Sequence, residues 1–227
     1  MVRDAEGKPL YREGIVEDIT PRKQAEEALV QSMEKLRRNL GGTIQAMSMM
    51  VETRDPYTAG HQRRVSDLAR TIAQEMSLPK ESVENIRLAG TIHDMGKISV
   101  PAEILSKPSK LTDIEMSLIK DHPQAGYEIL KDVDLPYPIA DFVLQHHERL
   151  DGSGYPQGLK NGQILLEAQI VSVADVVEAI ASHRPYRPAL GMEVALKEIE
   201  KGRGIFYDAE AVDACTILFK EKGFKFE

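Results

Sequence analysis

Apolar residues recur along most of the chain at the spacing of helices that bury one face. The clearest stripe starts at Val65 and continues at i+3, i+4, i+7 and i+8 to Met76 at i+11, which is the period of an amphipathic helix. The segment 167–182 is apolar almost all round, so we expect it near the centre of the fold. The pattern predicts an all-α bundle. Further helices are expected within residues 77–97, 112–122, 139–147, 191–202 and 208–223.

Short sequence signals mark several helix boundaries. The second helix is expected to start near Pro79 and to stop near Gly96. The segment Thr112–Glu115, TDIE, has the form of a capping box, in which each end residue bonds the other's backbone amide. Pro123 breaks or kinks this third helix, because proline has no amide hydrogen to donate.

The first twenty residues have the pattern of a short β-hairpin, with Gly7 in a polar turn. Two strands do not form a core of their own. Residues 1–20 are therefore either the end of another domain or a frayed terminal hairpin.

From Pro21 the pattern becomes helical, and Thr20 is suited to the N-cap. A seam of apolar residues at spacings of 4, 3 and 4 follows, which is typical of a coiled coil and favours a homodimer through this helix. The alternative is an amphipathic helix that packs on its own domain. We expect a linker helix at 21–44 and the main domain at 45–227. The seam consists of Leu29, Met33, Leu36 and Leu40.

The composition narrows the classes of function. The chain has 227 residues, of which 42% are hydrophobic, enough for one core of good size. A formal net charge of -7 argues against binding to nucleic acid polymers, which relies on a basic face. The single cysteine, Cys215, excludes an internal disulfide and fits a reducing cytoplasm. No apolar run is long enough to span a bilayer, so no membrane insertion is expected in this segment.

Histidines extend several of the apolar faces. His61 and His122 each lie four residues from an apolar position of the same expected helix, and so continue its inward face. His146 and His147 continue the apolar series of residues 139–143 at i+7 and i+8. A single inward histidine is commonly a hydrogen-bonded core residue, but several on different helices are harder to explain in that way.

Two acids and a fifth histidine join this set. His93 ends the second helix and is followed by Asp94, while Asp175 lies within the most apolar helix. Burying such groups without partners costs roughly several kcal/mol each, and a divalent metal site satisfies them together. Imidazole and carboxylate ligands without thiolate suit Fe, Mn, Co, Ni or Zn. Seven candidate ligands suit two ions; the alternative is a polar core without metal.

Two neighbouring ions also predict chemistry. A bridging carboxylate holds such ions roughly 3.5–4 Å apart, which is the spacing used in phosphoester hydrolysis. A hydroxide between them is a nucleophile at neutral pH, so no serine or cysteine nucleophile is needed. Lys97 lies three residues after Asp94, on the same face if the helix continues. Its ammonium would hold a phosphate or help the leaving oxygen; the alternative is a solvated surface lysine.

These residues lie in motifs of a known family. The segment 93–97, HDMGK, resembles the core motif of the HD phosphohydrolase superfamily. The segment 146–156, HHERLDGSGYP, resembles the extended motif of its HD-GYP subfamily. The resemblance covers about residues 45–222 and implies an HD-domain helical bundle with extra C-terminal helices. HD-GYP proteins are cytoplasmic bacterial phosphodiesterases that linearise cyclic di-GMP to 5′-pGpG, and some continue to GMP.

The resemblance also implies roles for single residues. Asp94 would bridge the two ions. The other six implied ligands are divided by our own interpretation, which puts one ion on His61, His93 and Asp175 and the other on His122, His146 and His147.

Other residues are implied at the substrate. Gly154, Tyr155 and Pro156 form the GYP motif, which would lie beside the substrate and offer a contact for a diguanylate cyclase. Arg184 and Arg187 match positions expected to meet a substrate phosphate or guanine, as an arginine fork suits both. Without the resemblance they would be interpreted as surface arginines.

Two further features refine the expected function. Family members with three metals carry a glutamate four residues before the first histidine, where this chain has Tyr57. A phenol is a poor ligand, so two ions and pGpG as main product are expected. Fe or Mn is the expected metal, ahead of Ni, Co and Zn. The segment 1–20, ending in DIT at 18–20, resembles the last strands of a PAS sensor domain.

Two other functions remain compatible with the sequence. One is a cyclic dinucleotide receptor, or an interaction module acting through the GYP motif, with little turnover. The other keeps the chemistry but uses cyclic GMP-AMP, which offers the same phosphodiester.

Overall fold

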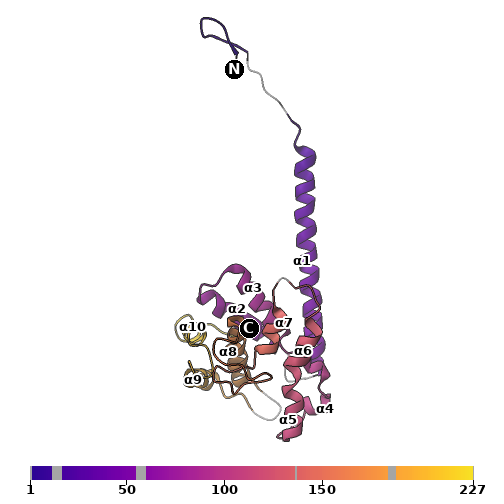
Figure 1. Cartoon of the computed structure of the whole chain (residues 1–227), viewed down its shortest axis with the longest axis vertical. Coiled ribbons are helices and arrows are strands. Elements are labelled where there is room, and N and C mark those ends of the chain that lie inside the picture. Colours follow the sequence, from indigo (N-terminus) through magenta and orange to yellow (C-terminus); the bar gives the residue numbers. More distant parts are fainter. Residues whose placement is uncertain (1, 12–16, 55–59, 136, 184–187, 227) are drawn as a thin grey trace. The chain divides into compact units, whose positions relative to one another are not determined.

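The computed structural model describes residues 2–11, 17–54, 60–135, 137–183 and 188–226. The chain divides into two compact units, Met1–Thr43 and Ile44–Glu227. Its described elements are β1 (Val2–Arg3), β2 (Pro9–Tyr11), α1 (Thr20–Arg54), α2 (His61–Glu75), α3 (Lys80–Ile92), the 3-10 helix η1 (Met95–Ser99), α4 (Ala102–Leu105), α5 (Asp113–Lys120), α6 (His122–Leu130), α7 (Ile139–Gln145), α8 (Leu166–Ala181), α9 (Met192–Lys201) and α10 (Ala209–Lys220) (Figure 1).

The first unit contains the predicted hairpin and most of the predicted linker helix. Strands β1 and β2 pair antiparallel, and Gly7 lies between them with a φ of 79°, a left-handed value that favours glycine. Helix α1 continues through Gly41 and Gly42 without a break and ends only at Arg54. The four apolar side chains of the predicted seam are 56% to 69% exposed, so they remain available for a partner helix.

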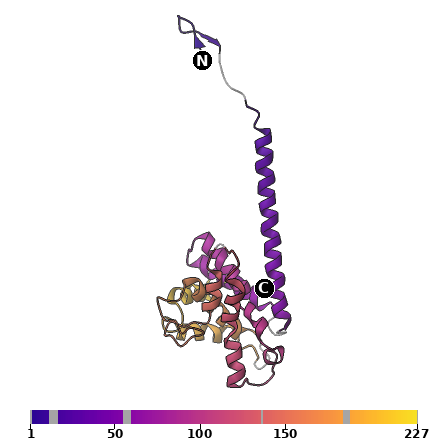
Figure 2. The same cartoon turned by 45° about the vertical axis from the view of Figure 1, so that its right-hand side comes forward.

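The second unit is the helical bundle that the apolar pattern predicts. Helix α2 packs against α3 and α8 through the stripe that begins at Val65, and this stripe is fully buried as far as Ala73. Helix α8 contacts α2, α3, α7, α9 and α10, which confirms that the most apolar segment lies at the centre (Figures 1 and 2). The fold prediction is confirmed.

One boundary was predicted wrongly. His122 was expected to extend the helix that contains Leu118, but α5 ends at Lys120 and His122 is the first residue of α6. The reason is Pro123, which lies in the first turn of α6, where a missing amide hydrogen costs nothing. The capping box at the start of α5 is present as predicted, with Thr112 and Glu115 bonding each other's backbone.

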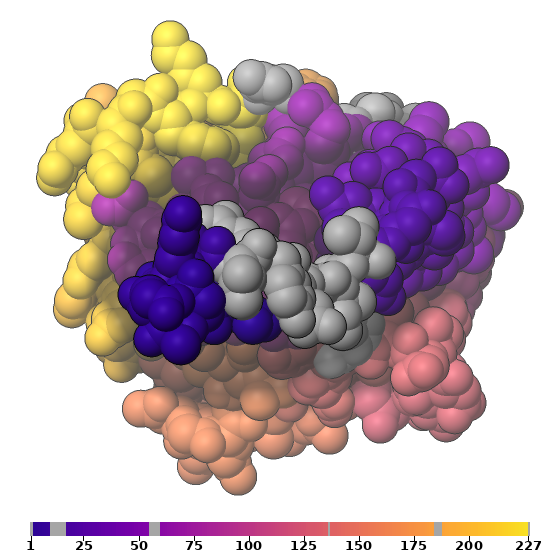
Figure 3. All heavy atoms as spheres, turned by 90° about the horizontal axis from the view of Figure 1, so that it is seen from above, coloured from indigo at the N-terminus to yellow at the C-terminus, as the bar shows by residue number. Residues whose placement is uncertain are grey.

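A space-filling view shows where two segments of the second unit lie on its surface. In the space-filling view, the C-terminal segment in yellow and the segment of α5 and α6 in pink lie on opposite flanks (Figure 3). Among the described helices, none combines the length and the apolar character needed to cross a membrane.

Candidate metal centre

Buried histidines and acids from separate segments converge inside the second unit. Two groups have one potential ligand atom per residue, and within each group these atoms all lie within 4.8 Å of one another. The first group comes from the start of α2 and the end of α3, and the second from the start of α6 and the end of α7. The groups are His61, His93 and Asp94, and His122, His146 and His147.

The two carboxylates of the centre lie between these groups. Oδ2 of Asp94 is 3.6 Å from Nε2 of His61 and 3.5 Å from Nε2 of His93. Its other oxygen, Oδ1, is 3.4 Å from Nε2 of His122. Asp175 is placed similarly, with Oδ1 3.2 Å from Nε2 of His61 and Oδ2 4.0 Å from Nδ1 of His147. Each acid therefore presents one oxygen to each group.

Local structure explains why the segments approach so closely. A Cβ on Gly96 would lie 1.9 Å from the carbonyl oxygen of His122 and 2.5 Å from the amide of Gly126, so only glycine fits between η1 and α6. This contact brings Asp94 next to His122. His61 is fixed by a carboxylate on α1, since Glu52 accepts hydrogen bonds from residues on either side of it, and these amides lack partners within the helix.

Hydrogen bonds orient the imidazole rings. In His93, His122 and His146, Nδ1 lies 2.8, 2.7 and 2.5 Å from the backbone carbonyl oxygen three residues earlier. A carbonyl oxygen only accepts, so each Nδ1 carries the hydrogen and donates it. Each neutral ring then presents the lone pair of Nε2 to the centre, which is the arrangement of a metal-binding histidine.

Burial and neighbouring charges favour the protonation states that bind metal. Burial lowers the pKa of His122 to about 4 and that of His146 to about 3. Burial alone would raise the pKa of Asp94, but the charge of Lys97 and those of nearby histidines hold it well below its usual value. The pKa of Asp175 is held low in the same way, against burial, first by a hydrogen bond from His61. Near neutral pH the rings of His122 and His146 are therefore neutral, and the carboxylates of Asp94 and Asp175 are ionised.

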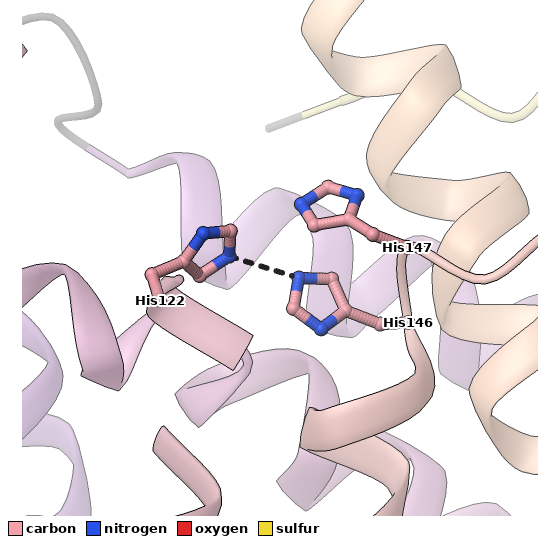
Figure 4. A group of neighbouring side chains, drawn as sticks. All are labelled: His122, His146 and His147. Carbon is pink, nitrogen blue, oxygen red and sulfur yellow. Dashed lines mark hydrogen bonds between the residues drawn. The ribbon is translucent and has the colours of Figure 1, made fainter. Parts of the chain in front are cut away.

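The residues present fit divalent cations. Nε2 of His122 and Nε2 of His146 lie 3.3 Å apart, as the dashed line in Figure 4 marks. Because both rings donate through Nδ1, two lone pairs face each other at this contact. Nε2 of His93 is buried, and within the described chain it has no hydrogen-bond partner. A bound cation would accept the facing lone pairs of His122 and His146 and would give Nε2 of His93 a partner. The imidazole and carboxylate donors suit transition metals.

Lys97 lies at the edge of the centre. Its Nζ is 2.6 Å from Oδ2 of Asp94, and its side chain is only 16% exposed. This differs from a solvated surface lysine. The helix does not continue through Lys97, because α3 ends at Ile92 and η1 follows; the tighter turn of η1 still brings the ammonium to the carboxylate.

The GYP segment packs directly beside the second group. The ring of Tyr155 lies 4.7 Å from that of His147, measured between centroids. The turn needs glycine at 154, where a Cβ would lie 2.5 Å from Cα of Glu148. The Glu148 carboxylate accepts hydrogen bonds from the backbone amides of Gln157, Gly158 and Leu159. Pro156, which follows a cis peptide bond, is exposed.

Sequence reasoning missed three residues around the centre. Glu178 contacts Nδ1 of His61, Glu148 anchors the GYP segment, and Lys120 places its Nζ 5.4 Å from the centroid of the Tyr155 ring. Of these three, only Glu178 could have been identified from the sequence, because it lies one turn from Asp175 on the same apolar helix. Tyr57, Arg184 and Arg187, for which roles were predicted, lie outside the described residues.

The helical fold and the two groups of potential ligands define a helical protein with a buried centre of histidines and aspartates. The family model described as an HD domain matches residues 45–211. The chain therefore belongs to the HD domain family, which agrees with the resemblance seen in its motifs.

Several known proteins similar to this chain are phosphodiesterases by name. The cyclic di-GMP phosphodiesterase response regulator RpfG of Xanthomonas campestris is 41% identical over 83% of this chain and 50% of its own length. A cyclic di-GMP phosphodiesterase of Thermotoga maritima is 41% identical over 78% of this chain and 49% of its own length. The crystal structure of a cyclic GMP-AMP specific phosphodiesterase of Vibrio cholerae, V-cGAP3, has a TM-score of 0.51 at 27% identity, covering 80% and 42% of the two chains. The chain thus spans about half the length of the curated relatives it matches.

Proposed function

We propose that this chain is a metal-dependent phosphodiesterase that hydrolyses cyclic di-GMP to 5′-pGpG. The observation that carries the proposal is the pair of imidazole nitrogens, on His122 and His146, that face each other with their lone pairs across 3.3 Å. Together with Asp94, which presents one oxygen to each group, they form a donor set suited to two divalent cations. The names of the similar proteins supply the substrate class.

The chain's own residues would act in defined ways. A pair of divalent ions, when bound, polarises a phosphate oxygen and lowers the pKa of water. Asp94 would contribute one ligand oxygen to each end of the centre, because its two oxygens face different groups. The ammonium of Lys97 is placed to neutralise phosphate charge and to give a proton to the leaving oxygen. Water adds to phosphorus, the bond from phosphorus to the 3′ oxygen breaks, and that oxygen takes a proton.

The finer properties of the centre are part of the proposal. We expect two ions per chain, and imidazole and carboxylate donors without thiolate suit Fe, Mn, Ni, Co or Zn. Of these we expect Fe or Mn. We expect His61, His93 and Asp175 on one ion and His122, His146 and His147 on the other, with Asp94 between them. We expect pGpG as main product and substrate contacts from Lys97, the GYP segment, Arg184 and Arg187.

A second substrate has a specific observation in its favour. The similar solved structure V-cGAP3 is named for cyclic GMP-AMP, and this dinucleotide presents the same phosphodiester to the same centre. The chain would then carry out the same reaction on a different signal. A third function, a cyclic dinucleotide receptor with little turnover, requires that Asp94 and Lys97 do no chemistry.

The setting of the domain is also proposed. Residues 45–227 would form the cytoplasmic output domain, and the hairpin at 1–20 would be the end of a PAS-like sensor. The exposed seam of α1 would join two copies, and Leu36, at 69% exposure, is its most exposed member. Leu36→Glu should then convert a dimer into a monomer in analytical ultracentrifugation.

A diguanylate cyclase partner would contact the GYP segment through Tyr155. A pull-down of the cyclase that is lost on Tyr155→Ala tests this contact.

Hydrolysis of cyclic di-GMP by the purified, metal-loaded chain tests the proposed function. Products are separated by chromatography, with 3′3′-cyclic GMP-AMP assayed in parallel. The proposal predicts that pGpG accumulates and that cyclic di-GMP is cleaved faster than cyclic GMP-AMP. Faster cleavage of cyclic GMP-AMP would favour the second substrate. Binding of cyclic di-GMP without cleavage would favour the receptor and contradict the enzyme.

A further inference from the structure

His61 is held differently from three other buried histidines of the centre. In His93, His122 and His146, Nδ1 donates to the backbone carbonyl oxygen three residues earlier in the chain. Nδ1 of His61 instead contacts Oε2 of Glu178, a residue 117 positions further along the chain. The first group therefore has a carboxylate behind one of its rings.

The carboxylate of Glu178 is itself held in place through its second oxygen. It is completely buried, and its second oxygen, Oε1, accepts hydrogen bonds from Nε and Nη2 of Arg64 at 2.8 and 2.6 Å. Oε1 also accepts from Oγ of Ser182 at 2.7 Å. Three donors on one oxygen leave Oε2 aimed at His61, and a buried carboxylate with such partners does not readily change place.

Two carboxylates on one face of α8 thus contact both ring nitrogens of His61. Glu178 lies three residues after Asp175, so the two carboxylates are neighbours on the helix. Asp175 meets Nε2 at 3.2 Å, and Glu178 meets Nδ1. The ring can rotate only if one of these contacts breaks.

We propose that Glu178 is the positioning residue of His61, and that the end of the centre containing His61 binds its ion more tightly than the end formed by His122, His146 and His147. A carboxylate behind a ligating imidazole fixes the ring and raises the basicity of the other nitrogen. The inference rests on the proposed binuclear function and states how its two ends differ.

Calorimetric titration of the metal-free, full-length chain with Mn²⁺ tests the inference, with bound ions counted by mass spectrometry. The wild-type chain should show a tight and a weak step. Glu178→Gln keeps the size of the side chain but removes its charge, so it should weaken the tight step about 10–100-fold and leave the weak step unchanged. An unchanged tight step, or equal weakening of both steps, would overturn the inference.

Ser182→Ala is the matched control. It removes a hydrogen bond to the same carboxylate but leaves the contacts of Glu178 with His61 and Arg64. Both binding steps should therefore stay as in the wild type. If Ser182→Ala weakens the tight step as much as Glu178→Gln does, the effect is one of packing and the positioning role is contradicted.

A second variant covers the case in which Glu178→Gln does not fold. Glu178→Gln combined with Arg64→Gln removes both charges of this ion pair, so Arg64 does not face a neutralised Glu178; the same weakening of the tight step is expected, and its absence would overturn the inference. A wild-type chain that binds no Mn²⁺ contradicts the proposed function itself. A wild-type chain that binds two ions and hydrolyses cyclic di-GMP, with an intact tight step in both variants, contradicts only this inference.

Discussion

The two ends of the candidate centre are built from the same side chain but are supported in different ways. At one end, His61 lies between two carboxylates of α8, and Asp94 approaches from the end of α3. At the other end, His122 and His146 are oriented by backbone carbonyl oxygens three residues earlier, which for His122 is that of Ile119 in α5. The first end also has the carboxylate of Glu178 against His61, whereas the second consists of imidazole rings that face one oxygen each of Asp94 and Asp175. Identical ligands can therefore form two sites of different affinity.

Asp94→Ala is expected to have the largest effect, because it removes the group that both ends share. The variant should lose both ions, and hydrolysis of cyclic di-GMP should fall by more than about 10³-fold. Asp67→Ala is the control, since Asp67 is half exposed and its carboxylate lies 4.0 Å from Nη1 of Arg63, a long surface pair. Unchanged metal content in Asp94→Ala would contradict a bridging carboxylate.

Substitutions at single histidines separate the ends. His122→Ala should lose the ion of the imidazole end and keep the other, because the carboxylates around His61 remain. His61→Ala should do the reverse. Metal analysis after gel filtration, expressed as ions per chain, measures both. Loss of both ions in His122→Ala would show that the ends do not bind independently.

Lys97→Ala tests the chemistry while leaving every candidate metal ligand in place. Lys97 contacts Asp94 through its ammonium and is not a potential metal ligand in either group. The variant should keep both ions while the turnover number falls about 10²-fold, as expected for the loss of one charge that stabilises a transition state. Lys110→Ala, at an exposed lysine, is the control. A rate near that of the wild type would return Lys97 to a structural role.

The smallest expected effect is on the stability of the metal-free chain. Burial lowers the pKa of His122 to about 4 and of His146 to about 3, against about 6.5 when unfolded. As pH falls below about 6.5, the unfolded rings take up protons first. The free energy of unfolding should thus fall by about 1.4 kcal/mol per pH unit for each ring, down to about pH 4.

The two ends differ in this respect as well. The carboxylates Asp94 and Asp175 have pKa values below 3.8, so their contribution to stability is lost only in more acidic solution. Urea denaturation of the metal-free chain at about pH 7 and about pH 5 measures the contribution of the imidazole end. Equal free energies of unfolding at the two pH values would contradict neutral, buried rings.

Sequence periodicity predicted the parts of the molecule that depend on local spacing. The inward positions of His61 and His146 followed from their distance to apolar residues on the same helix. The start of α6 at His122 was not predicted, because a proline is compatible both with a kink and with a first helical turn. The contact between Glu178 and His61 joins residues 117 positions apart, and no local pattern encodes which buried acid meets which ring.

The central claim is that the converging imidazoles and carboxylates hold a pair of divalent ions that the chain uses to cleave a phosphodiester. The most direct test determines ions per chain and the product formed from cyclic di-GMP in the same purified preparation. The account predicts two ions, formation of pGpG, and loss of hydrolysis when a chelator removes the ions. Full hydrolysis by a metal-free chain, or no cleavage by a chain with two bound ions, would contradict it.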